Sequence, residues 1–253
     1  MGWLLITRFT LQEAIRRRLF LTMAITIYAG IAITILAMWL VYLVISTMTI
    51  FLTISMISGE IEAGTFVVIV PKPLRRAEII FGKWLGYALI LGLYTLLLSL
   101  AFMGIIYWFT GYWPTYAFAA IGMLEISMLV LLGLITLCGA FVPTAANGAI
   151  AVMLFMGAFI SSIVQFAIPA QDYMVQNITA VISLIMPTDA MWHGASYYLF
   201  PAAIGVLQNF SVSSVNTPFT ATQPISPQLL TWAILYSLVL PLIAILRFQR
   251  RDL

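Results

Sequence analysis

Charged residues are scarce in this sequence of 253 amino acids. Only 8% are Asp, Glu, Lys or Arg, while 63% are hydrophobic. A soluble domain usually carries about 25% charged residues. So few charges cannot cover a water-exposed surface, and most of the outer surface must therefore face lipid. The composition excludes an ordinary soluble enzyme and predicts an integral membrane protein.

The residues that usually build metal and redox sites are also nearly absent. Cys138 is the only cysteine and His193 the only histidine. One cysteine cannot form an intrachain disulfide, and one of each is too few for a usual zinc site. The thirteen methionines are scattered among the apolar segments, which favours core filling over copper ligation. We expect no catalytic residue, metal ligand or cofactor-binding residue in this chain.

Long uncharged stretches separate the charged clusters. A helix needs about 20 apolar residues to cross a bilayer, and it satisfies its backbone polar groups internally. The sequence therefore predicts an all-α fold: a polytopic membrane helix bundle with six transmembrane helices, in one domain over residues 1–253. The expected spans are residues 19–37, 40–58, 84–109, 116–141, 149–168 and 229–246, with turns at Met38-Trp39, 111–114 and 143–148.

Basic residues occur in only three segments: 1–18, 60–83 and 247–253. Cytoplasmic loops of membrane proteins carry an excess of Lys and Arg. Six spans place all three segments on one side, whereas an odd number separates the first from the third. The pattern predicts an even number of spans in a cell (inner or plasma) membrane, with both termini in the cytoplasm.

Two segments outside these spans have a different character. Residues 1–18 mix apolar and charged side chains, which favours an interfacial helix at the inner surface over a spanning one. Residues 169–228 are largely uncharged and rich in polar residues. There we expect short re-entrant helices on the outer side over 178–207, followed by a polar loop; the alternative is one more full span. Thr188-Asp189-Ala190, after Pro187, is typical of a helix N-cap.

A few polar residues within the predicted spans are candidate pathway residues. Glu125 is the only ionisable side chain in a predicted span, and intramembrane charges are often functional. It also lies near enough to the outer end to reach interfacial water, so a structural role stays open. Ser161, Ser162 and Gln165 are suited either to contact a substrate or to hydrogen-bond across helices.

The main connection between spans, residues 58–86, carries the strongest functional signal. Glu60 and Glu62 open it, an apolar run follows at 66–70, and a basic cluster ends it. Pro71 and Pro73 forbid a continuous helix. An exposed apolar run of this kind marks a contact with a protein or a membrane. The residues alone fit a docking element and a loop resting on the bilayer equally well.

This stretch resembles the cytoplasmic loop of type-2 ABC permeases, the exporter family. The matching residues, in order, are Glu60, Glu62, Gly64-Thr65, Pro73, Arg76, Ile79-Ile80 and Gly82-Lys83. The C-terminal sequence Phe-Gln-Arg-Arg-Asp-Leu, residues 248–253, is also similar to the family's usual ending. Two features depart from the pattern. The first two spans have almost no connection, and the β-branched run at 66–70 has a weak helix propensity.

The resemblance implies a membrane-spanning permease subunit of an ATP-driven ABC transporter, which exports a substrate as a dimer. It implies a short coupling helix that docks on a separate ATPase subunit. The implied ATPase-coupling residues are Glu60, Glu62, Gly64, Thr65, Phe66 and Arg76.

The resemblance also sets the expected partners. The chain lacks a Gly-x-x-x-x-Gly-Lys-Ser/Thr sequence, so ATP and Mg are expected on the partner subunit. The partners are ABC ATPase subunits, a second permease subunit and the lipid bilayer, with no nucleic acid. The alternative is a non-transporting structural or anchor subunit of a larger membrane complex. An intramembrane hydrolase is disfavoured, because one histidine and one intramembrane glutamate make a poor catalytic set.

Overall fold

The computed structural model describes residues 2–59, 76–167, 173–200, 220–221 and 223–249. Every regular element within these ranges is helical: α1 (Gly2–Thr53), α4 (Arg76–Thr110), α5 (Ala117–Phe141), α6 (Thr144–Ala167), α7 (Tyr173–Ile185), α8 (Thr188–Leu199) and α10 (Pro227–Gln249). Among the described residues, five helices are long and apolar enough to cross a membrane: Ile25–Thr53, Ala77–Thr110, Ala117–Phe141, Thr144–Val164 and Pro227–Arg247. The predicted all-α membrane bundle is confirmed, but the described chain carries five such helices where six spans were predicted.

The first two predicted spans form one continuous helix, so the predicted turn at Met38-Trp39 was wrong. α1 has 52 residues, a length of about 78 Å at 1.5 Å per residue. Its buried side chains recur every three or four residues through the predicted turn, at Ile31, Ile35, Met38, Tyr42 and Ile45. No proline interrupts the helix, and such a stripe needs one unbroken helical face.

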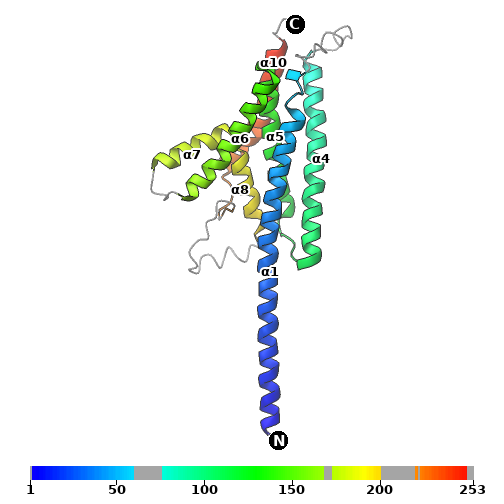
Figure 1. Ribbon diagram of the computed structural model, residues 1–253, viewed down its shortest axis with the longest axis vertical. Helices are drawn as coiled ribbons and strands as arrows, with labels where there is room; N and C mark the ends of the chain where they lie inside the picture. Colours follow the sequence, from blue (N-terminus) through cyan, green and yellow to red (C-terminus); the bar gives the residue numbers. More distant parts are fainter. Residues whose placement is uncertain (1, 60–75, 168–172, 201–219, 222, 250–253) are drawn as a thin grey trace.

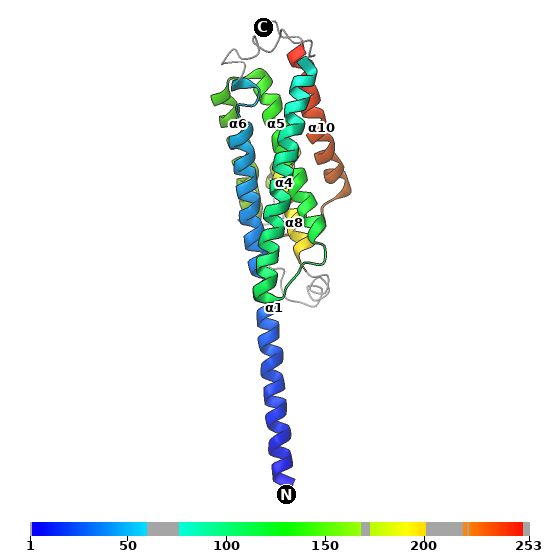
Figure 2. The same ribbon diagram turned by 90° about the vertical axis from the view of Figure 1, so that its right-hand side faces the viewer.

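The N-terminal part of α1 extends beyond the other helices (Figure 1, Figure 2). A side chain at Gly30 would meet Thr110 and Tyr112, so Gly30 is level with the end of α4. From Gly2 onward, the residues of the interfacial helix predicted over 1–18 belong to α1 and form no separate helix; their position at the membrane surface stays a prediction. The N-terminal end of α1 lies opposite the C-terminal end of α10 (Figure 1). The predicted even number of spans is not confirmed by the described residues, which contain five candidate spans.

α5 is the central helix of the bundle. It contacts α1, α4, α6, α8 and α10, and Leu124, Met128 and Leu131 are fully buried. Its approach to α10 depends on Gly133, where a Cβ would lie 3.2 Å from the Ser237 carbonyl oxygen and 3.5 Å from Pro241 Cδ. The close packing of these two helices therefore requires a residue without a side chain.

The later predicted spans correspond to α4, α5, α6 and α10, with ends that differ by up to eight residues. Gly111, with a φ of 69°, makes the predicted turn after α4. The turn predicted over 143–148 is shorter than expected, because α6 begins at Thr144.

Two short helices, α7 and α8, lie in the region where short helices were expected. α7 runs back from the far end of α6 toward the bundle, and α8 then lies along α5 (Figure 1). Trp192 of α8 stacks on Tyr42 of α1 with ring centroids 5.6 Å apart. The predicted Thr188-Asp189 cap was wrong: the N-cap residue is Pro187, and it makes no side-chain capping hydrogen bond. The Asp189 carboxylate is bonded elsewhere, as described below.

Candidate functional site

The two flanks of the 60–75 segment meet at one end of the bundle. Met56 and Ile57 precede the segment, and Ile80 and Trp84 follow it; these four residues share one buried cluster with Leu132 of α5 and Ile245 of α10. Lys83 Nζ also donates a hydrogen bond to the Met56 carbonyl at 3.3 Å. We call residues 53–59 and 76–84 the loop junction.

Two polar residues of α6 hold the first half of the loop junction. Asn147 is 1% exposed, and its Nδ2 donates to the carbonyl oxygens of Ile54 at 3.0 Å and Ile135 at 3.2 Å. Thr144 Oγ1 donates to Ser58 Oγ at 3.0 Å. Side chains that bridge helices in this way hold them in one register in a membrane. The loop junction is thus bound to α6 by hydrogen bonds and to α5 and α10 by apolar packing, and Asn147 extends the hydrogen bonding to α5.

A second feature is a polar cavity of about 410 Å³ between α6, α7, α8 and the start of α10. Hydroxyl groups and one carboxylate supply most of its polar lining. The lining includes Ser161 and Ser162 of α6, Thr179 and Ser183 of α7, Asp189 and His193 of α8, and Ala221, Gln223 and Ser226 before α10. Ligand pockets typically enclose about 300–1,000 Å³, so the cavity is large enough for a small molecule.

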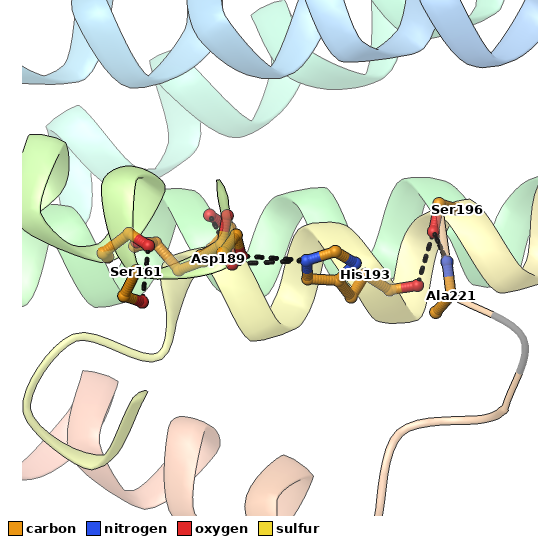
Figure 3. Close-up of polar contacts among 9 residues, drawn as sticks. Ser161, Asp189, His193, Ser196 and Ala221 are labelled. Carbon is orange, nitrogen blue, oxygen red and sulfur yellow. Dashed lines mark hydrogen bonds and ion pairs between the residues drawn. The ribbon is translucent and has the colours of Figure 1, made fainter. Parts of the chain in front are cut away.

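Ser162, Asp189 and His193 form a hydrogen-bonded cluster in this cavity. The Ser162 hydroxyl donates to the Asp189 carboxylate, and Ser162 Oγ lies 3.0 Å from His193 Nε2. Asp189 Oδ2 and His193 Nε2 are 3.4 Å apart, one turn along α8 (Figure 3). In a Ser-His-Asp triad the hydroxyl and the carboxylate bind opposite ring nitrogens. Here both contact Nε2, so the cluster does not have the geometry for that chemistry.

Two hydrogen bonds hold the segment before α10, which forms one side of the cavity, against α8. Ser196 Oγ donates to the His193 carbonyl at 2.8 Å and accepts from the Ala221 amide at 3.0 Å (Figure 3). The segment before α10 is therefore tied to the same helix that carries Asp189 and His193.

Comparison with known protein families matches residues 8–253 to the family described as ABC-2 family transporter protein. The chain belongs to the ABC-2 family. No curated protein and no solved structure matches it. The resemblance based on residues 58–86 is confirmed. Together with its apolar helices, membership of the ABC-2 family makes the chain a multi-pass transmembrane permease of the ABC transporter class.

The predicted ATPase-coupling residues of this ABC-2 protein fall almost entirely outside the described residues. Glu60, Glu62, Gly64, Thr65 and Phe66 lie within 60–75. Arg76 is the first residue of α4, but its side chain is outside the described part. Their role stays a prediction, and the loop junction is the part of this region that the structure describes.

The candidate pathway residues of the ABC-2 protein lie in different places. Ser161 and Ser162 line the cavity, and Gln165 lies on the same helix, with a side chain outside the described part. Glu125 faces α4, where a Cβ on Gly92 would lie 3.2 Å from its Oε2, and it does not line the cavity. The pathway roles of all these residues stay predictions.

Asp189 and His193 were not predicted as site residues. Their spacing of four residues was the available signal, because residues i and i+4 share one face of a helix. The position of Ser162 beside them depends on how α6, α7 and α8 fold back on one another, which no local pattern indicates.

Proposed function

We propose that this chain is the membrane-spanning subunit of an ATP-driven exporter, and that it works as a dimer coupled to separate ATPase subunits. The family match over residues 8–253 carries the proposal, supported by the coupling-loop motif at residues 60–83. ATP and Mg bind to the partner, and this chain supplies the translocation pathway and the docking loop.

The loop junction supports this coupling in physical terms. Its two flanks pack in one cluster with residues of α5 and α10, and α6 holds it through Asn147 and Thr144. Protein interiors are close-packed and transmit displacement, so a force applied to the loop acts on all of these helices together. Closure of the ATPase pair then favours one of two arrangements of the bundle.

We also propose that the loop and the C-terminal segment face the cytoplasm, in the inner or plasma membrane of a cell. Residues 60–83 and 247–253 carry seven of the eleven basic residues, and residues 1–18 carry the other four. Because the loop and the C-terminal segment carry most of the basic residues, the positive-inside rule favours the cytoplasmic side for them. ATP is also available on that side. With α1 as a single span, the N-terminus then lies on the outer side.

Co-purification tests the coupling proposal. The full chain, extracted in mild detergent, is compared with Glu62→Ala, Gly64→Pro and the control Gly64→Ala. We expect an ATPase subunit to accompany the wild type and Gly64→Ala. We expect it to be lost, or its activity uncoupled from transport, in Glu62→Ala and Gly64→Pro, because proline restricts the backbone that must dock.

The opposite result supports a different class of function. If no nucleotide-binding partner accompanies the wild type under mild conditions, the transporter proposal fails. The chain is then best explained as a structural or anchor subunit of a larger membrane complex.

A further inference from the structure

We infer that the cavity between α6, α7 and α8 binds a small organic ammonium ion, with Asp189 as its counter-charge. The inference deepens the proposed function, on which it rests in one respect: the ammonium ion is the class of substrate that the permease would carry. Binding itself requires only this chain, which makes it separately testable.

The charge balance of the cavity favours a cation. Among the described residues that line it, Asp189 is the only carboxylate and none is Lys or Arg. The whole residue is 9% exposed, and a poorly solvated carboxylate is costly unless it is paired. Ser162 donates to it and His193 Nε2 lies 3.4 Å away, but a hydroxyl and a neutral imidazole bring no positive charge. A bound ammonium group would supply that charge.

The protons of the cluster point to the same ligand class. Ser162 donates its hydroxyl proton to Asp189, so its 3.0 Å contact with His193 Nε2 is made by a ring N–H that donates to Ser162 Oγ. In a neutral imidazole the other nitrogen, Nδ1, is then an acceptor. With a neutral imidazole, the cluster therefore presents acceptors and one negative charge.

The hydroxyl groups around the cluster add further acceptors. Ser161 donates to the Ala158 carbonyl at 2.9 Å, and Ser183 donates to the Ala180 carbonyl at 2.8 Å. A hydroxyl that has given its proton to the backbone keeps lone pairs for a ligand. An acceptor-rich cavity with a carboxylate suits a protonated amine, which has N–H donors, and it disfavours carboxylates and phosphates.

The walls of the cavity suit the apolar part of an amine. Ala180, Ala190, Ile225 and Leu229 also line it, so a ligand with a charged head and a short apolar body matches both kinds of surface. Ligand sites are typically apolar, with a few convergent polar groups.

Equilibrium binding to the purified full chain in detergent tests this inference. The probe is radiolabelled tyramine, a protonated primary amine with one aromatic ring, and the competitor is tyrosol, its neutral alcohol. We expect saturable tyramine binding that excess unlabelled tyramine displaces and tyrosol does not. Absence of saturable binding, or equal competition by tyrosol, overturns the inference, because a site for a cation must distinguish the two.

Three variants locate the bound amine. Asp189→Asn removes the charge and keeps the shape, and we expect it to weaken tyramine binding by about tenfold or more. Ala180→Phe fills the cavity without altering the hydrogen-bonded cluster, and we expect the same loss. Glu125→Gln removes a carboxylate that faces α4, and we expect wild-type binding. Full affinity in Asp189→Asn and Ala180→Phe, or an equal loss in Glu125→Gln, contradicts this site.

The two proposals fail in different ways. Binding is measured without an ATPase subunit, so a missing partner leaves the tyramine result unchanged. If tyramine binds but does not stimulate the ATPase activity of a co-purified complex, the cavity is an ammonium-binding site but not a transport site. If a complex hydrolyses ATP but tyramine does not bind, the exporter proposal stands and the ammonium site is wrong.

Discussion

Asn147 Nδ2 lies 3.0 Å from the carbonyl oxygen of Ile54, and this bond joins α6 to the chain that leads into the 60–75 loop. A second bond from the same nitrogen reaches Ile135 of α5 at 3.2 Å. One buried amide thus bridges three parts of the chain at the loop junction. If the loop receives force from an ATPase, this residue passes it to the centre of the bundle.

Asn147→Leu removes both bonds at nearly constant volume. We expect a loss of about 1–2 kcal/mol in stability, measured as a lower thermal midpoint in detergent. We also expect retained co-purification of the ATPase with weaker coupling of its activity to transport. Asn177→Leu, on an exposed position of α7, is the control and should change neither property. Full coupling in Asn147→Leu would show that the amide is only structural.

Gly133 lies where α5 packs closely against α10. In Gly133→Val the new Cβ would lie 3.2 Å from the Ser237 carbonyl, a backbone atom that cannot rotate away. Overpacking of this kind costs about 1–3 kcal/mol, so we expect a clearly lower thermal midpoint. Gly122→Val, on the same helix but with no atom within 4 Å of its Cβ position, should be nearly neutral. Equal midpoints for the two variants would contradict the packing argument.

Four of the expected spans could be predicted because each is a single apolar run between turns or charges. α4 and α5, for example, are separated by Gly111, whose positive φ makes the turn. The first apolar run, residues 19–58, is different. It is long enough for two spans, so its length is compatible with one helix or with two. The register of Ile31, Ile35, Met38 and Tyr42 decides in favour of one. The same stripe can be read from the sequence, because these four residues have helical spacing through the predicted turn.

The polar cavity was less predictable, for a physical reason. Ser162 and Asp189 are 27 residues apart, and they meet because α6, α7 and α8 fold back on one another. Only the Asp189–His193 pair can be recognised in the sequence, because its two residues are four apart in one helix. Contacts between α6 and α8 depend on the path of the chain in space, and hydrophobic periodicity within one helix does not predict them.

Tyr112 ties the α4–α5 connection to the end of α8. Its hydroxyl donates to the Leu199 carbonyl at 2.6 Å, and burial raises its pKa from 10 to about 12. A pKa raised by folding means that the neutral form contributes stability fully below pH 10. This contribution is lost as the pH rises from 10 toward 12, because the phenol of the unfolded chain ionises in this range before the buried one does.

Tyr112→Phe removes the bond, and we expect a loss of about 0.5–1.5 kcal/mol at neutral pH. The difference in thermal midpoint between wild type and variant should shrink between pH 10 and pH 12. Tyr116→Phe, at an exposed position, should match the wild type at neutral pH. A difference between wild type and Tyr112→Phe that stays constant to pH 12 would mean that folding does not raise the pKa of Tyr112. Equal midpoints at neutral pH would mean that the hydroxyl bond contributes nothing.

The course of α1 makes the sharpest prediction about topology. The N-terminal end of α1 and the C-terminal end of α10 lie at opposite ends of the structure (Figure 1). If α1 crosses the membrane once, as one helix, we expect these two ends on opposite sides of it. This arrangement puts four arginines near the N-terminus outside the cell, whereas basic segments favour the cytoplasmic side. The unbroken apolar stripe of α1 opposes the alternative, in which the helix breaks near Met38 into two spans.

Cysteine labelling in intact cells separates the two arrangements. Single cysteines are placed by Thr7→Cys, Thr115→Cys and Leu253→Cys in a Cys138→Ala background, and a membrane-impermeant maleimide is added outside. Thr115→Cys lies in the connection between α4 and α5. If the 60–75 loop is cytoplasmic, this connection lies outside in both arrangements, so Thr115→Cys should react and serves as the positive control. If α1 is one span, Thr7→Cys also reacts, and Leu253→Cys reacts only after the cells are opened. Protection of both ends until opening would mean that α1 divides into two spans, because only an even number returns the chain to the cytoplasm.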